Sequence, residues 1–187
     1  MGSMLTALAG FLQAKSKHGL WLLRIDDIDT PRVAAGAVDA IRRTLERYGL
    51  QWDQTEFIQS KRLEPYHQAL GKLESLGLLY PCTCSRKSLA NLHEPGMQSA
   101  AYPGICRNAR RSRRQTHALR VLTTNARINI TDLLQGPQSW DIEQNPGDFI
   151  VLRRDGIFSY HLATVIDDWQ SGVSEVLRGF DLLDSTP

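Results

Sequence analysis

An apolar segment that leads directly into carboxylates constrains the fold of this chain most. Residues 20–25 (LWLLRI) form a short apolar run, and acidic residues follow it at once. Such a run is typical of a buried strand in a parallel sheet. Helices are predicted before it, over residues 3–17, and after it, over residues 64–77. Strand and helix therefore alternate, which predicts an α/β layered fold.

The boundaries of the predicted helices carry their own signals. Asp29 or Thr30 can cap a helix that has Pro31 in its first turn, where the missing N–H costs nothing. Gly49 is expected to end that helix, and Gly77 is expected to end the next one.

The middle of the chain has a different character. Residues 82–117 contain all three cysteines, two Pro-Gly pairs and a run of arginines, with weak hydrophobic periodicity. This composition predicts a loop-rich insertion that cannot bury much core by itself. We therefore expect three parts: residues 1–81 as the first part of the main domain, residues 82–117 as the insertion, and residues 118–187 as the remainder.

Strands are predicted to return after the insertion. They are expected in HALRVLT, in RINIT, and on both sides of a turn at residues 154–156 (RDG). Residues 174–178 (SEVLR) are expected to form another strand, and a helix is expected to start at DLLDSTP.

Composition excludes several classes of protein. The 187 residues are 42% hydrophobic and carry a net charge of +2, so no strong overall field draws the chain to nucleic acid. No apolar run approaches the ~18–20 residues needed to cross a bilayer, and no membrane partner is expected. Three clustered cysteines, an odd number, argue against a disulfide framework and predict a reduced, cytoplasmic setting.

Three carboxylates follow the predicted strand over residues 20–25. Asp26, Asp27 and Asp29 would lie at the carboxyl end of a parallel strand, the edge where open α/β sheets bind ligands. A carboxylate there could hold an ammonium group, an arginine or a metal ion. The alternative is that Asp27 and Asp29 serve only as helix caps and turn residues.

Two further polar side chains are expected at strand ends. Tyr160 and Arg178 are both flanked by predicted turns, and an arginine suits two-pronged recognition of a carboxylate or phosphate. The alternative is a structural ion pair between Arg178 and either Asp167 or Asp168.

The cysteines suggest a metal site. Cys82 and Cys84 form a Cys-x-Cys turn, and Cys106 supplies a third thiolate for tetrahedral zinc. The fourth ligand could be His93, which is the better ligand chemically, or Tyr102, which lies nearer to Cys106. Three unrelated buried or free cysteines are the alternative.

A cluster of arginines adjoins the last cysteine. Such a cluster can bind phosphates, although no aromatic residues interleave with it to stack bases. A solvated loop is the ordinary explanation for a run of charge. The cluster consists of Arg107, Arg110, Arg111, Arg113 and Arg114.

Taken together, four segments resemble those of the glutamyl-queuosine tRNA(Asp) synthetases, short relatives of class I glutamyl-tRNA synthetase. The segments are RIDDIDTPR, YPCTC with YPGIC, FIVLRRDGIFSYHLATVIDD and VLRGFDLLDSTP, in the family's order. The resemblance implies a Rossmann-type parallel sheet with a small zinc-bearing insertion. It also implies that Cys82, Cys84, Tyr102 and Cys106 hold the zinc, so that Tyr102 outranks His93. Four protein ligands would make the zinc structural.

The resemblance also implies a glutamate site. Asp26 matches a family glutamate that holds the α-ammonium group of the substrate, and it is one methylene shorter. Tyr160 and Arg178 match glutamate-binding positions, with Arg178 suited to the side-chain carboxylate of the substrate. No side chain is expected to act as a nucleophile, since the α-carboxylate of glutamate itself attacks the α-phosphate of ATP.

The implied activity is activation of glutamate with ATP, with Mg²⁺, and its transfer to the queuosine base of tRNA(Asp) by a monomer. The chain as written lacks the family's histidine-bearing opening motif and its K-x-S-K loop, so we expect impaired adenylate formation. One alternative is a piece of an ordinary glutamyl-tRNA synthetase, against which Ile28 and the Tyr-x-x-x-Cys arm argue. The other is a non-catalytic, zinc-containing RNA-binding module.

Overall fold

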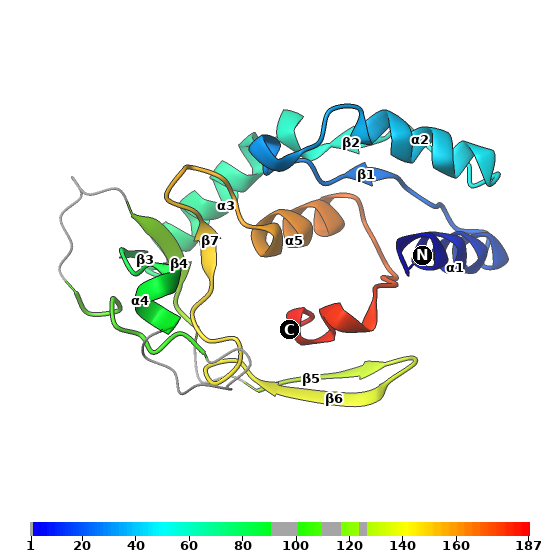
Figure 1. Cartoon of the computed structure of the whole chain (residues 1–187). Coiled ribbons are helices and arrows are strands. Elements are labelled where there is room, and N and C mark those ends of the chain that lie inside the picture. Colours follow the sequence, from blue (N-terminus) through cyan, green and yellow to red (C-terminus); the bar gives the residue numbers. More distant parts are fainter. Residues whose placement is uncertain (1, 91–100, 110–116, 124–126) are drawn as a thin grey trace. The chain divides into compact units, whose positions relative to one another are not determined.

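The computed structural model describes residues 2–90, 101–109, 117–123 and 127–187 (Figure 1). They form two compact units, which are described separately. The first unit comprises Met1–Tyr66 and Ala163–Leu183, and the second comprises His67–Leu162 and Asp184–Pro187.

The first unit contains a parallel pair of strands joined through a helix. Its elements are α1 (Gly2–Ser16), β1 (Arg24–Ile25), the 3-10 turn η1 (Thr30–Arg32), α2 (Ala37–Arg47), β2 (Phe57–Ile58) and the 3-10 turn η2 (Gln59–Lys61). β1 and β2 are parallel, with Arg24 opposite Phe57 and Ile25 opposite Ile58. The predicted α/β character with a parallel sheet is therefore confirmed, although only two residues of the apolar run at 20–25 are in a strand.

Two helices have residues in both units. They are α3 (Glu64–Ser75) and α5 (Tyr160–Gln170), and a 3-10 segment, η3 (Phe180–Ser185), follows α5. α1 and α3 agree with the predicted helices. Gly49 and Gly77 have φ angles of 71° and 69°, the left-handed conformation in which a glycine ends a helix.

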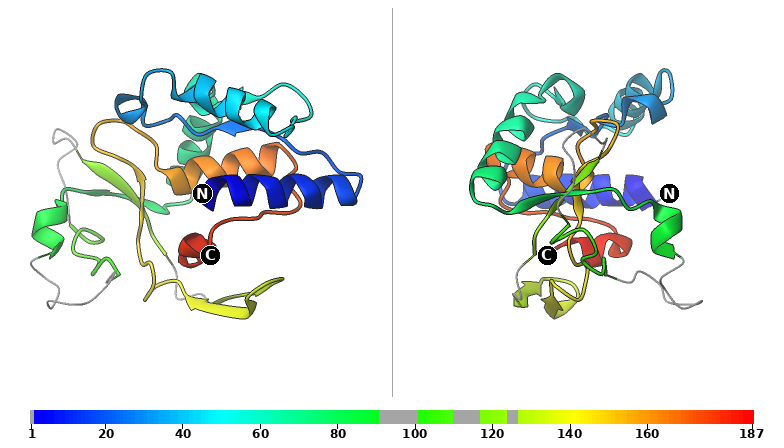
Figure 2. Two further views of the ribbon diagram at one scale, coloured as in Figure 1. Left: turned by 45° about the vertical axis from the view of Figure 1, so that its right-hand side comes forward. Right: turned by 90° about the vertical axis from the view of Figure 1, so that its left-hand side faces the viewer.

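The second unit consists mainly of antiparallel strands. Its elements are β3 (Leu79–Cys82), α4 (Arg86–Ala90), β4 (Ala118–Val121), β5 (Arg127–Asp132), β6 (Gly136–Asp141) and β7 (Ile150–Leu152). β3, β4 and β7 form one sheet in that order, and β5 pairs with β6 in a separate hairpin. Both views of Figure 2 show this hairpin beyond one end of the three-stranded sheet of the same unit.

Three local predictions are wrong. The helix expected to start after Asp29 or Thr30 begins only at Ala37, because Val33 is extended and Gly36 takes a left-handed φ of 76°. Asp29 makes no side-chain cap. The predicted strand at residues 174–178 is irregular.

The apolar run after residue 156 forms the helix α5 and not a second strand. Its most deeply buried residues are Ala163 and Asp167, which are four apart and therefore lie on one helical face. Tyr160 consequently begins a helix, where a strand end was predicted. Among the described residues, no helix combines the length and the apolar character needed to cross a bilayer.

A buried carboxylate organises the core of the first unit. Asp167 is fully buried and accepts hydrogen bonds from the Tyr66 hydroxyl at 2.8 and 2.9 Å and from Gln59 Nε2 at 2.8 Å. Tyr66 and Gln59 are themselves buried. Burial raises the pKa of Tyr66, and the hydrogen bond to Asp167 raises it further, so the hydroxyl keeps its proton and donates it.

We expect Tyr66→Phe to lower the free energy of unfolding by about 2 kcal/mol, because a buried carboxylate loses a hydrogen-bond donor. Urea unfolding measures this change. Tyr48→Phe is the matched control, since the Tyr48 side chain is 69% exposed. Equal stability of the two variants would show that the Tyr66 hydroxyl does not stabilise Asp167.

Candidate metal centre and carboxylate cluster

Two chain segments bring three cysteines and a tyrosine together in the second unit. Side chains alternate along β3, so that Tyr80 and Cys82 share its buried face, and Cys84 follows two residues later. On the second segment, Gly104 takes a left-handed φ of 73°, which turns the chain between Tyr102 and Cys106. Cys82, Tyr102 and Cys106 are buried.

The side chains converge as a ligand set would. The three sulfur atoms lie within 4.8 Å of one another, with 3.6 Å between Cys84 and Cys106. The Tyr102 hydroxyl oxygen lies 3.4 Å from Cys82 Sγ and 3.5 Å from Cys84 Sγ. This cluster could hold a metal ion. His93, the other candidate for the fourth ligand, lies outside the described residues.

Burial disfavours the anionic forms of these groups. It raises the pKa of the Cys84 thiol and of the Tyr102 phenol, and the surrounding thiols add to the rise at Tyr102. Thiolates and a phenolate can share so small a space only beside a cation, because the like charges would otherwise repel one another. Either the cluster is protonated or it holds a metal ion.

A second buried carboxylate, Asp148, lies at the centre of this unit. Its oxygens accept hydrogen bonds from Tyr80, from Arg107 at 2.5 and 2.9 Å, and from the backbone and side chain of Thr123 at 2.9 and 2.8 Å. Burial alone would raise the pKa of Asp148, but the donors, led by Arg107, outweigh it and hold the pKa at about 2. Sequence reasoning missed Asp148, since a single aspartate before an apolar strand carries no distinctive signal.

Arg107 has a structural partner on each side. In addition to Asp148 it binds Glu143 at 2.9 Å. Its guanidinium is therefore bound within the protein, which differs both from a phosphate contact and from the solvated loop considered for the cluster. The other four arginines of the cluster lie outside the described residues.

The first unit places Asp26 directly after β1, as predicted. Its carboxylate accepts a hydrogen bond from Arg24 Nε at 2.6 Å, and the same guanidinium binds Asp168. The Asp26 side chain remains 36% exposed. An ammonium group could therefore reach it, but would share it with Arg24.

The two neighbouring aspartates have structural contacts. Asp27 accepts hydrogen bonds from the backbone N–H of Ser60 at 2.8 Å and from its hydroxyl at 2.7 Å, which ties the end of β1 to η2. Asp29 forms an ion pair with Arg32 at 3.3 Å. Both carboxylates thus have structural contacts, although that of Asp29 is not the helix cap which the alternative supposed.

The other two predicted glutamate-binding residues lie in different units. Tyr160 begins α5 in the second unit and is 39% exposed. Arg178 lies in the irregular segment before η3 in the first unit. The alternative partners considered for Arg178 have contacts of their own: Asp167 binds Gln59 and Tyr66, and Asp168 binds Arg24.

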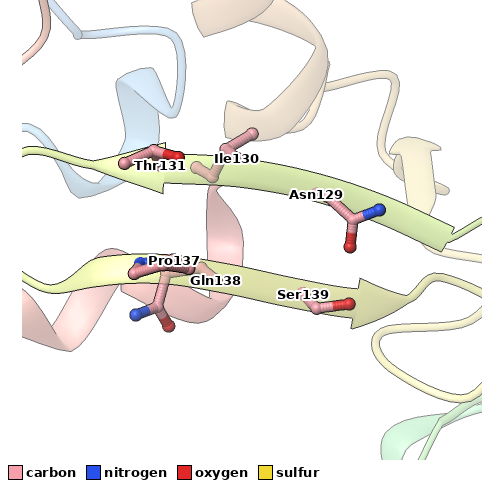
Figure 3. A pocket seen from close by; sticks show the side chains of 6 residues that line it. All are labelled: Asn129, Ile130, Thr131, Pro137, Gln138 and Ser139. Atoms are coloured by element: carbon pink, nitrogen blue, oxygen red, sulfur yellow. The ribbon is translucent and has the colours of Figure 1, made fainter.

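Shallow surface hollows occur away from the metal cluster. One lies on the hairpin of the second unit (Figure 3), between β5 and β6. Its lining residues are Asn129, Ile130, Thr131, Pro137, Gln138 and Ser139. Another, in the first unit, follows residues 33–39 beside Asp27 and Thr30. No residue of the predicted glutamate set lines either hollow.

A parallel strand pair with carboxylates at its carboxyl end is typical of α/β folds that bind ligands at that edge of the sheet. All 187 residues match the family described as tRNA synthetases class I (E and Q), catalytic domain, and the chain belongs to that family. It is 45% identical over 185 residues to a glutamyl-Q tRNA(Asp) synthetase of Aromatoleum aromaticum. That alignment covers 99% of this chain and 58% of the relative.

A second relative and a solved structure are similar to this chain over almost its whole length. A glutamyl-Q tRNA(Asp) synthetase of Dechloromonas aromatica is 44% identical over 188 residues, covering all of this chain and 62% of that protein. The chain thus spans about three-fifths of the length of these relatives. Among solved structures, a glutamate tRNA ligase from Elizabethkingia meningosepticum matches with a TM-score of 0.84 at 23% identity. That match covers 98% of this chain and 42% of the ligase, and it supports the fold.

The stability of the second unit is expected to depend on acid through Asp148. Its pKa is lowered from 3.8 to about 2, so its carboxylate stabilises the fold above about pH 4, and this contribution is lost as the pH falls towards 2. The loss should be about 2 kcal/mol and should be absent from Asp148→Asn. Urea unfolding at a series of pH values measures it.

Asp39→Asn is the control for that series, since the Asp39 side chain is 63% exposed. It should keep the acid dependence of the parent chain. The same acid dependence in Asp148→Asn would assign the effect to other carboxylates.

Proposed function

We propose that this chain is the catalytic-domain portion of an enzyme that activates glutamate with ATP and transfers it to the queuosine base of tRNA(Asp). The 45% identity over 99% of the chain to a glutamyl-Q tRNA(Asp) synthetase carries this proposal. Family membership over all 187 residues supports the class of reaction. The position of Asp26 at the carboxyl end of β1 supports a ligand site there.

The proposed first step needs no protein nucleophile. A carboxylate oxygen of glutamate attacks the α-phosphorus of ATP, the bond to the bridging oxygen breaks, and pyrophosphate leaves with the electron pair. The work of the protein is then to position both substrates and to stabilise the developing charge. In the second step a nucleophile on the queuosine base attacks the acyl carbon, and AMP leaves.

Three residues are proposed to hold glutamate. Asp26 would bind the α-ammonium group, with Arg24 fixing the orientation of its carboxylate. Arg178 would bind the side-chain carboxylate, since a guanidinium matches a carboxylate with two parallel hydrogen bonds. Tyr160 would supply a hydroxyl, and its 39% exposure leaves it open to a ligand.

The metal of the cysteine cluster is proposed to be zinc. For Zn–S bonds of about 2.3 Å and a Zn–O bond of about 2.0 Å, a tetrahedral site places sulfur atoms about 3.8 Å apart and sulfur about 3.5 Å from oxygen. The separation between Cys84 and Cys106 is 3.6 Å, and the Tyr102 oxygen lies 3.4 and 3.5 Å from two sulfurs. These three distances fit zinc held by Cys82, Cys84, Tyr102 and Cys106, all three sulfurs of which lie within 4.8 Å of one another, and such zinc would be structural.

The zinc assignment predicts that Cys84→Ser loses the metal. The purified parent chain should contain about one zinc per chain by elemental analysis, and the variant should contain much less. The variant should also unfold at a lower temperature, whereas chelation should lower the melting temperature of the parent alone. Full zinc occupancy in Cys84→Ser would contradict the ligand set.

The glutamate site predicts a loss of affinity in Asp26→Asn. Removing a charged partner of the ammonium group should raise the Kd for glutamate about tenfold or more, as measured by calorimetric titration. Asp39→Asn should leave the Kd unchanged. An unaltered Kd in Asp26→Asn would remove Asp26 from the site, and tighter binding of glutamine or aspartate than of glutamate would contradict the substrate.

Activation itself is tested by ATP–pyrophosphate exchange on the 187-residue chain without tRNA. Exchange that requires glutamate would support the enzyme. A folded, zinc-loaded chain that binds tRNA without any exchange would favour the non-catalytic RNA-binding module. Exchange only in the presence of tRNA would favour an ordinary glutamyl-tRNA synthetase.

A further inference from the structure

Arg120 on β4 is a buried cation beside the candidate metal centre. The residue is 6% exposed, and its guanidinium carbon lies 3.8 Å from the centre of the Tyr102 ring. Its terminal Nη1 donates to the backbone carbonyl of Asp148 at 2.5 Å. Within the described residues, its Nε is buried without a hydrogen-bond partner. All three residues belong to the second unit.

The charge of Arg120 requires an anion. A guanidinium stays protonated in proteins, and an isolated buried charge is strongly unfavourable. The carboxylate of Asp148, whose backbone carbonyl Arg120 binds, is held by Arg107, Tyr80 and Thr123, and Arg107 also binds Glu143. Asp148 and Arg107 thus form a neutral, largely buried pair, and the second carboxylate, that of Glu143, is 40% exposed to solvent.

The metal centre would supply that anion. A divalent ion bound by three thiolates and a phenolate carries a net charge of −2, and Tyr102 is the member of this set against which Arg120 packs. A guanidinium stacked on the ring also fixes the plane of the ring and hence the direction of its oxygen. The Cys106 N–H donates to the same oxygen at 3.0 Å, so two contacts orient it.

We propose that Arg120 is the charge-balancing and positioning residue of the metal centre, holding Tyr102 as a ligand and offsetting the negative charge of the metal–ligand complex. The proposal rests on the proposed metal centre and goes beyond its four ligands. This role would explain why a charged residue is buried at position 120, where an apolar side chain would suffice for packing.

The charge can be removed with the packing largely kept. Arg120→Met keeps the apolar stem, Arg120→Gln keeps a donor for the Asp148 carbonyl, and Arg120→Lys keeps the charge without the planar stack. The control is Arg127→Met, because Arg127 is exposed at the start of β5. The zinc Kd is measured by competition with a chromophoric chelator, and ligand geometry is read from the visible spectrum of the cobalt-substituted chain.

We expect the neutral variants to bind zinc roughly ten- to a hundredfold more weakly, as is usual for residues that support metal ligands. The zinc Kd of Arg120→Lys should lie between those of the neutral variants and that of the parent. The cobalt spectrum should change in all three variants. The effect on stability should depend on the metal. In the metal-free chain the neutral variants should be as stable as the parent or more so, since an unbalanced charge is removed, whereas the zinc-loaded variants should melt lower than the zinc-loaded parent.

An unchanged zinc Kd in both neutral variants would overturn the role of Arg120 and leave the metal centre in place. Equal destabilisation of the metal-free and zinc-loaded forms, with an unchanged cobalt spectrum, would likewise reduce Arg120 to a packing residue. A parent chain that binds no zinc would instead contradict the metal centre itself. If Arg120→Met fails to fold, the zinc Kd of Arg120→Gln decides between these outcomes.

Discussion

The second unit depends on one buried negative charge. The Asp148 carboxylate binds a residue of β3 (Tyr80), the residue after the last cysteine (Arg107) and the residue two positions beyond β4 (Thr123). Three segments far apart in the sequence therefore meet at one group, which is stable as an anion because several donors outweigh its desolvation. The metal ligands lie on the same segments, so the geometry of the cluster follows from this anchor.

The first unit also contains a buried carboxylate that is surrounded by hydrogen-bond donors. Asp167 is buried on α5 and is satisfied by donors from η2 and α3, as Asp148 is satisfied in the other unit. Asp168, the next residue, instead shares Arg24 with Asp26 at the end of β1. The two adjacent aspartates therefore have different roles. Asp167 stabilises the core, and Asp168 helps Arg24 to orient the carboxylate of Asp26, a candidate ligand-binding group.

The sequence predicted those features that depend on local pattern. The helices α1 and α3, the glycines that end helices, and the parallel strand with its carboxylates were all predicted correctly. The strand predicted after residue 156 was wrong. An apolar run without clear periodicity is compatible with either a strand or a helix, and here tertiary packing selects the helix α5. Tyr102 was favoured over His93 by resemblance alone, and its place beside the cysteines depends on contacts distant in sequence. For the same reason Arg120 and Asp148 carried no signal.

The contact between Cys84 and Tyr102 affects how many residues the segment between them can gain or lose. Their side chains are 3.5 Å apart, so the two ends of the 17-residue segment between them are held together. The entropy of closing a flexible loop rises only slowly with its length, by about 0.6 kcal/mol for each doubling. Insertions and deletions between the two arms should therefore persist in homologues, whereas a change of even one residue between Tyr102 and Cys106 would shift the turn that places both ligands.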